Sequence, residues 1–94
     1  SNAHEPGGPF HFARWTGLDH PVRPVQELTQ EEATQKETYY EAYFDERGRL
    51  TTLTKHAGEE REYEYRYSYE NGFSYEIEDF DKDHIERGPP PRRE

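Results

Sequence analysis

The sequence predicts a mostly β, α+β domain, formed by an antiparallel meander of four or five strands with one short helix. Two observations carry this prediction. Tyrosines recur at every second position of EYEYRYSY, residues 62–69, which is the period of a strand with one apolar face. Two glycine-containing turns, DERG at 45–48 and ENG at 70–72, each separate two strand-like runs, as in β-hairpins.

The composition predicts a small core built from aromatic rings. Of the 94 residues, 29% are hydrophobic and 15% aromatic, and none is cysteine. Each tyrosine or phenylalanine buries a large area, so a small sheet can become stable with few aliphatic residues. Without cysteine the chain has no disulfide, zinc–thiolate site or cysteine nucleophile. No apolar run approaches the roughly 20 residues that span a bilayer, so we expect no membrane association.

We expect a single folded domain over residues 10–86. Residues 1–3, SNA, resemble the remnant of a cleaved tag, and residues 4–9 lack an apolar pattern, so disorder is expected over 1–9. The prolines of residues 87–94, RGPPPRRE, predict a disordered tail, because proline lacks the backbone donor. The chain contains no methionine, so we expect either an exported protein after signal removal or a domain of a longer chain.

The first strand is predicted over residues 9–17, PFHFARWTG, which alternates weakly and ends in glycine. Phe10 and Phe12 would share one face of this strand, and Trp15 would lie on the other. The two prolines of the following LDHPVRPVQEL segment impose an extended, non-helical path.

A short surface helix is predicted over residues 30–36. Thr29 and Glu32 have the spacing of a capping box, and Leu28 with Ala33 can form the hydrophobic staple that accompanies it. The segment has almost no apolar face, so we expect it to lie on the surface.

Register decides which residues of the second hairpin face the core. A two-residue turn would place the tyrosines opposite serine and glutamate, whereas a three-residue loop over 70–72 pairs Tyr67 with Tyr75. A shift by one residue exchanges the two faces, so the apolar pattern selects the three-residue loop, with Gly72 in a left-handed conformation. The resulting surface, here called the tyrosine face, comprises Tyr63, Tyr65, Tyr67, Tyr69, Phe73, Tyr75 and Ile77.

Two interpretations of the tyrosine face stay open at this point. It is either a core face, covered by the helix, the proline-containing segment and Trp15, or a partly exposed contact site, as contiguous apolar patches often are. The first hairpin is ambiguous in another way, because apolar residues occur on both of its faces. Tyr39, Tyr43 and Leu53 fall on one face, and Tyr40, Ala42, Phe44 and Leu50 on the other.

The net charge of −9 is concentrated in the C-terminal half. Residues 57–86 contain eleven acids and three bases, a net of −8, whereas residues 10–56 contain eight acids and six bases, a net of −2. Such a surface repels phosphate backbones, which argues against nucleic-acid binding. It attracts a basic protein partner or simply keeps the chain soluble.

The sequence shows no catalytic or metal-binding pattern. Asp79, Asp81 and Asp83 alternate like the first ligands of a calcium loop, but His84 stands where that loop needs glycine and Pro90 where it needs an acid. The five histidines lack ligand spacing, and there is no phosphate-binding glycine loop or nucleophile elbow. We therefore expect no metal, no cofactor and no enzymatic activity.

Residues 43–56, YFDERGRLTTLTKH, resemble a YD-type (Rhs) repeat, with an aromatic residue, aspartate, two turn residues, glycine and a strand. Residues 67–76, YSYENGFSYE, resemble a degenerate copy, 24 residues later, that lacks the aspartate. The resemblance implies antiparallel strands stacked side by side. The arrangement of residues 13–50 also resembles small uncharacterised bacterial domains of unknown function, which implies no activity.

The expected function is that of a non-catalytic protein-interaction module with an acidic surface. It would serve as an inhibitor or immunity protein for a basic target, or as a structural domain of a longer chain. A free sheet edge would also allow a homodimer. The alternative is small-ligand or glycan binding through exposed tyrosines. The candidate binding residues are Tyr39, Tyr43, Glu62, Glu64, Glu76 and Glu78.

Overall fold

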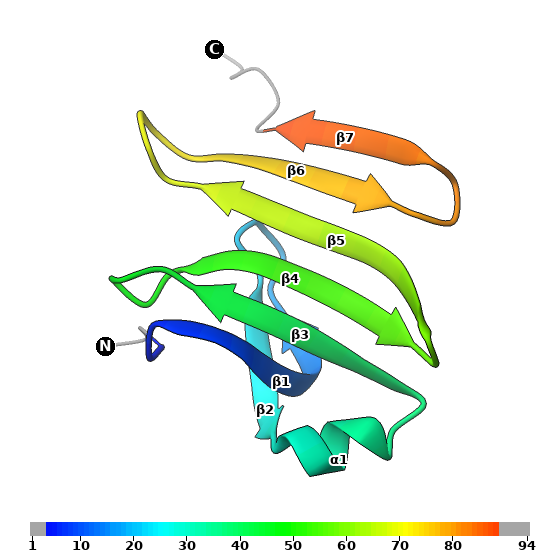
Figure 1. Ribbon diagram of the computed structural model, residues 1–94. Helices are drawn as coiled ribbons and strands as arrows, with labels where there is room; N and C mark the ends of the chain where they lie inside the picture. The colour runs from blue at the N-terminus through cyan, green and yellow to red at the C-terminus, as the bar shows by residue number, and fades with distance from the viewer. Residues whose placement is uncertain (1–3, 89–94) are drawn as a thin grey trace.

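The computed structural model describes residues 4–88, which form one seven-stranded antiparallel sheet and one short helix (Figure 1). The strands follow the order β2-β1-β3-β4-β5-β6-β7 across the sheet. Their bounds are Gly7–Thr16 for β1, Arg23–Leu28 for β2, Thr38–Phe44 for β3, Leu50–Ala57 for β4, Glu60–Ser68 for β5, Ser74–Asp79 for β6 and His84–Gly88 for β7. The prediction of a mostly β, antiparallel fold with one helix is therefore confirmed.

The structure has seven strands rather than four or five because two strands form the sheet edges. The extended proline segment pairs with β1 as β2, and its Pro24 is tolerated because an edge strand leaves some backbone positions unpaired. At the other edge β7, with the sequence HIERG, pairs with β6 along its whole length. Most of β7 is exposed, so it carries none of the apolar alternation that marked the inner strands.

The folded part extends beyond the expected bounds of 10–86 at both ends. Strand β1 begins at Gly7, and the His4 ring stacks on Phe44 with centroids 4.1 Å apart. The His4 backbone N–H also donates to the Gly48 carbonyl at 3.0 Å. At the other end β7 includes Gly88. The expected disorder at 4–9 and 87–88 is thus corrected by strand pairing and ring packing, while residues 1–3 and 89–94 lie outside the described residues.

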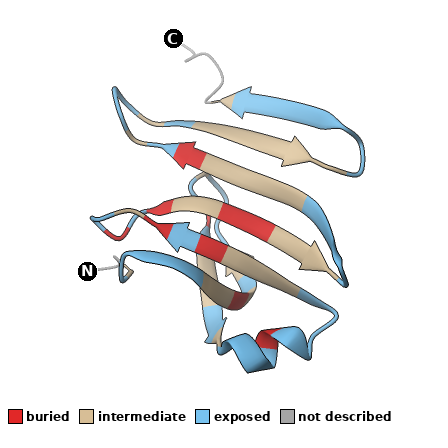
Figure 2. Ribbon diagram, in the orientation of Figure 1, coloured by how far each residue is buried: buried red, intermediate tan, exposed pale blue. Residues whose placement is uncertain are grey.

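The β1–β2 hairpin folds across one face of the sheet and makes the core there. Figure 1 shows β2 passing behind β3 and β4, and Figure 2 shows buried residues on β3, β4 and the end of β5. We call this covered side the inner face and the opposite side the outer face. The buried core consists of Phe12, Val22, Ala42, Phe44, Leu50, Leu53 and Tyr67.

The second hairpin adopts the predicted three-residue-loop register. Tyr67 pairs with Tyr75 and Tyr65 pairs with Ile77, and Gly72 has a φ of 94°, in the left-handed region that favours glycine. The tyrosine face lies on the inner side of the sheet. Tyr67 is only 6% exposed, whereas the other six residues of the face are half-buried. The core interpretation therefore holds most fully at Tyr67.

The cover of the tyrosine face comes from the β1–β2 hairpin. The Trp15 indole N–H donates to the Tyr63 hydroxyl at 3.1 Å, and the His20 ring packs against Tyr65, Tyr67 and Tyr75. The helix, α1, spans Gln30–Thr34 and packs against β1 and β2 instead. The expectation that the helix covers the tyrosines was therefore wrong. Strand β2 leads the chain away from the tyrosine face, so α1 begins at the open end of the β1–β2 hairpin.

Two assignments of side chains to faces are also corrected. Trp15 packs on the same core as Phe12, although simple alternation put them on opposite faces. The alternation shifts between these residues, next to Gln26 of β2, whose left-handed φ of 62° disturbs the pleat. In the first hairpin Leu53 pairs with Ala42, so it lies on the inner face rather than beside Tyr39.

Helix α1 is shorter than the predicted 30–36 but begins as expected. The Thr29 hydroxyl accepts from the Glu32 N–H at 3.1 Å, and the Glu32 carboxylate accepts from the Thr29 N–H at 2.8 Å, which completes the capping box. Ala33 is buried, and the rest of the helix is exposed. Within residues 4–88 no helix has the length and apolar character needed to cross a membrane.

Candidate functional site

Three of the predicted binding glutamates surround one arginine on the outer face of the sheet. Arg66 of β5 donates from Nη1 to Glu64 at 2.7 Å, and from Nη2 to Glu76 at 3.0 Å and Glu78 at 3.1 Å. The register brings them together, since Arg66 pairs with Glu76 and Glu64 pairs with Glu78 across β5 and β6. Alternation then places all four side chains on one face.

This arrangement neutralises much of the charge that the sequence assigned to a binding surface. The hydrogen bonds that Arg66 donates to Glu64, Glu76 and Glu78 raise the pKa of Arg66 above its usual value. Arg66 in turn lowers the pKa of the Glu76 carboxyl, with help from Arg87, whose Nε donates to Glu76 at 2.7 Å. The outer face is therefore a network of paired charges rather than a purely acidic patch.

The remaining predicted acid, Glu62, lies near the other end of β5. Its carboxylate is 3.0 Å from the Lys55 ammonium group of β4. Its backbone carbonyl accepts from the Phe80 N–H at 3.0 Å, which ties the start of β5 to the β6–β7 turn. Glu62 therefore belongs to a different part of the surface from Glu64, although the two are separated by one residue.

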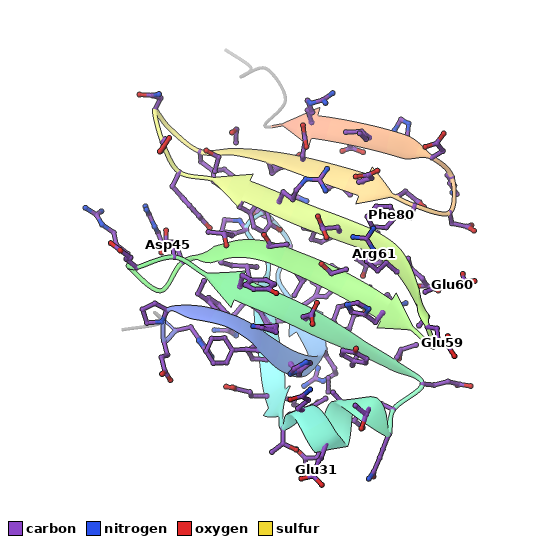
Figure 3. The ribbon with its side chains drawn as sticks, viewed as in Figure 1. Glu31, Asp45, Glu59, Glu60, Arg61 and Phe80 are labelled. Atoms are coloured by element: carbon purple, nitrogen blue, oxygen red, sulfur yellow. The ribbon has the colours of Figure 1, made fainter. Side chains whose placement is uncertain are left out.

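A cleft of about 430 Å³ lies between the start of β5 and the end of β6 with its following turn. We call it the acidic cleft. Figure 3 shows Arg61 and Phe80 lying close together between β5 and β6, with Glu59 and Glu60 toward the β4–β5 turn. The lining consists of Glu60, Arg61, Glu62, Asp79, Phe80 and Asp81.

Hydrogen bonds within the β6–β7 turn and one stacking contact give the acidic cleft its shape. The Asp79 carboxylate accepts from the backbone N–H groups of Asp81 and Lys82, both at 3.1 Å, which is the usual way that aspartate stabilises a turn. The Arg61 guanidinium lies over the Phe80 ring, 4.3 Å from its centroid. Within the described part of the chain, no three histidine or acidic side chains are arranged to hold a metal ion.

The two tyrosines proposed as ligand-binding residues lie on the outer face of β3, away from the acidic cleft. The Tyr39 ring stacks on His56, with centroids 4.9 Å apart and an interplanar angle of 12°. His56 is held by Glu41, 3.2 Å from its Nε2. Tyr43 is 40% exposed. One ring face of Tyr39 is thus already occupied by a side chain of the protein.

Sequence reasoning identified the acids of this region but missed the residues that organise them. Arg66 is the single base within EYEYRYSYE, residues 62–70, and the predicted register already placed it opposite Glu76. That signal was available from charge complementarity across strands. The contact of Arg61 with Phe80 follows from the same register, because the β5–β6 ladder continues from the Tyr63–Asp79 pair to the bond between the Phe80 N–H and the Glu62 carbonyl. Its signal was therefore also available.

Comparison with known proteins gives a family but no relative of established role. The model of a family of unknown function, DUF6156, matches residues 4–86. No curated protein and no solved structure shows a significant match.

Proposed function

The chain belongs to DUF6156, a family of unknown function, and we propose that it is a non-catalytic interaction module whose acidic cleft receives a basic segment of a protein partner. The observation that carries this proposal is the lining of the cleft. Four carboxylates, those of Glu60, Glu62, Asp79 and Asp81, line it together with the Arg61 guanidinium, and of the four only Glu62 forms an ion pair among the described residues, with Lys55.

The unpaired charge favours this end of the sheet over the outer face. Glu64, Glu76 and Glu78 already contact Arg66, so a partner would have to compete with an internal cation for them. By contrast, Glu59, Glu60, Asp81 and Asp83 form no ion pair within residues 4–88. Uncompensated carboxylates at one end of a molecule attract a basic partner and accelerate its association.

The cleft also offers a contact for the apolar part of a basic side chain. Phe80 is half-buried, and Arg61 already stacks on its ring. The stem of an arginine or lysine from a partner can lie along the same ring while its head reaches Glu60 or Asp81. An inhibitor of a basic target and a docking domain of a longer chain would both use this chemistry.

Titration of the isotope-labelled protein with a short oligoarginine peptide, followed by NMR at low and high salt, tests the proposal. We expect salt-sensitive shifts that centre on Arg61 and Phe80. The double variant Glu60→Gln/Asp81→Asn should bind about threefold to tenfold more weakly, as expected when two exposed charge pairs are lost. The matched control is Glu31→Gln, which removes an exposed acid from α1 (Figure 3). Equal affinities of the two variants, or shifts centred elsewhere, would overturn the proposal.

We also propose self-association through the free edge of β7. Ile85 is 40% exposed on this edge strand. Antiparallel pairing of two copies with Ile85 opposite the partner's Ile85 also brings His84 opposite the partner's Glu86. Sedimentation velocity over a concentration series should then show a dimer that Ile85→Lys abolishes and Leu18→Lys, at an exposed loop position, retains. A monomer at every concentration would contradict this.

We also propose that the two hairpins are related to YD-type repeats and that the chain is a bacterial domain. The Asp45 carboxylate accepts from the backbone N–H groups of Arg47 and Arg49, and Gly48 has a φ of 77°, as the aspartate and glycine of that motif imply. The second hairpin pairs in a different register, so Tyr43 lies on the outer face and its equivalent Tyr67 on the inner face. Bacterial relatives with aspartate both at position 45 and at the equivalent position 69 would support a repeat origin. Relatives that lack aspartate at both positions would oppose it.

A further inference from the structure

A second cleft, of opposite chemistry, lies at the other end of β4, and we propose that it binds a small organic anion with an apolar body. The cleft measures about 530 Å³ and is formed by the start of β2, the β3–β4 turn and the end of β5. We call it the apolar cleft. Its apolar lining consists of Pro21, Val22, Pro24, Phe44, Leu50 and Tyr69.

The floor of the apolar cleft is part of the protein core. Val22, Phe44 and Leu50 are each less than a tenth exposed, and all three belong to the buried cluster. The volume falls within the range of roughly 300–1,000 Å³ that is usual for small-molecule sites. A ligand here would therefore bury an apolar body against side chains that water reaches poorly, and this burial would provide most of the affinity.

The charge at the rim selects an anion. Two arginines, Arg23 and Arg49, line the cleft, and no acid among the described residues does. This is unusual in a chain with 21 acids and 12 bases. Arg23 is exposed and forms no ion pair within residues 4–88. A guanidinium on an apolar rim is suited to hold a carboxylate or sulfonate through paired hydrogen bonds.

The second arginine is already fixed in position. The Arg49 Nε donates to Asp45 at 2.9 Å, and its guanidinium lies 4.3 Å from the centroid of the Tyr69 ring. Within the described part of the chain its two terminal nitrogens have no hydrogen-bond partner. Asp45 offsets part of the positive charge of Arg49, so Arg23 supplies the larger attraction and Arg49 supplies orientation.

Hydrogen bonds fix the lining residues of the apolar cleft in position without a ligand. The Tyr69 hydroxyl donates to the Leu50 carbonyl at 2.7 Å, and the Val22 N–H donates to the Tyr67 hydroxyl at 3.2 Å. A site that is ordered before binding loses less conformational entropy when the ligand enters. The inference does not rest on the proposed function, because it involves other residues and the opposite ligand charge.

Fluorescence titration with anilinonaphthalene sulfonate tests the inference, because this probe combines aromatic rings with one anionic group. We expect one bound probe per folded chain, with NMR shifts centred on Val22, Leu50 and Tyr69. Arg23→Gln should weaken binding about tenfold to hundredfold, the usual effect of losing a charge-assisted hydrogen bond. The matched control is Arg14→Gln on the neighbouring strand, which is exposed and lies outside the cleft.

A neutral analogue separates the anion from the apolar body. Phenylnaphthylamine, which lacks the sulfonate, should bind more weakly than the sulfonate to the native chain and equally to native and Arg23→Gln proteins. Three results would each overturn the inference. The native protein could fail to bind the sulfonate, or Arg23→Gln and Arg14→Gln could bind it with equal affinity. The third is that Arg23→Gln weakens binding of the neutral analogue as much as binding of the sulfonate. The oligoarginine titration is independent of all three results, so the two proposals can fail separately.

Discussion

The imidazole Nδ1 of His20 lies 2.8 Å from the hydroxyl oxygen of Tyr67, where the connection between β1 and β2 crosses the tyrosine face. The Tyr67 oxygen also accepts from the Val22 N–H, so its own hydrogen can be donated to an unprotonated Nδ1. Burial lowers the pKa of His20, and the nearby Glu86 and Asp19 carboxylates oppose this effect. A neutral His20 therefore fastens the β1–β2 connection to the sheet.

Acid should loosen this attachment. The pKa of His20 in the folded chain lies below its ordinary value of 6.5, so on acidification the unfolded chain binds the proton first. The stability that neutral His20 contributes is complete above pH 6.5 and declines below it, until folded His20 itself titrates. Urea unfolding on both sides of pH 6.5 measures this decline, which should be smaller in His20→Gln. Parallel pH profiles for the two proteins would contradict the prediction.

Removal of the Tyr67 hydroxyl should destabilise the fold although the ring is kept. Tyr67→Phe leaves the buried Val22 N–H without its acceptor, and we expect a loss of about 1–3 kcal/mol in the free energy of unfolding. The control is Tyr43→Phe on the exposed outer face, which should change stability by less than about 0.5 kcal/mol. Denaturant unfolding distinguishes the two, and similar losses would show that the Tyr67 hydrogen bonds are not responsible.

Replacement of Arg66 should leave the carboxylates of the outer face without the cation that they surround. In Arg66→Gln the pKa of the Glu76 carboxyl should rise toward its ordinary value of 4.5, because Arg66 is the main cause of its lowering. In the native protein, the lowered Glu76 pKa contributes stability that is complete above the pKa of the unfolded chain and is lost as the pH falls through the pKa of the folded chain. The stability of the variant should therefore depend less on pH in this range. Carbon-detected NMR titration of the side-chain carboxyl measures the effect. Arg14→Gln, on β1, should leave the Glu76 pKa unchanged.

A side chain at position 88 should move the Tyr75 ring. A Cβ on Gly88 would collide with the Tyr75 Cζ and with its hydroxyl oxygen. These atoms are at the end of a flexible side chain, so Gly88→Ala should swing the ring aside and change stability by less than about 1 kcal/mol. The contacts of Tyr75 with His20 should weaken in NMR spectra of the variant. Ser74→Ala, beside Tyr75 but exposed, should preserve them, and preserved contacts in both variants would refute the expectation.

The register of the second hairpin was predictable because a single physical conflict decides it. A shift by one residue would turn Tyr67 outward and bury the glutamates of β6, so the apolar pattern leaves one register. Strand β7 had no comparable signal. Its residues are mostly exposed and it is held by backbone hydrogen bonds to β6, which depend little on side-chain type.

The candidate sites were less accessible to sequence reasoning because they depend on proximity in space. The cross-strand position of Arg66 was implicit in the register, and so was that of Phe80 beside Arg61, but the register does not show that a cleft opens there. The apolar cleft joins Val22, Leu50 and Tyr69 from three separate segments, so no local pattern marks it. Trp15 shows the same limit, since it packs on the core although simple alternation along β1 places it on the other face from Phe12.

The order of the strands in the sheet has a consequence for how quickly the chain folds. Neighbouring strands are consecutive in sequence except β1 and β3, so most pairings close short loops, and the meander from β3 to β7 can assemble one hairpin at a time. The bonds from Trp15 to Tyr63 and from Val22 to Tyr67 span 48 and 45 residues. They close longer loops than the strand pairings do and are expected to form after the rate-limiting barrier. Weakening them should accelerate unfolding while the folding rate stays nearly constant.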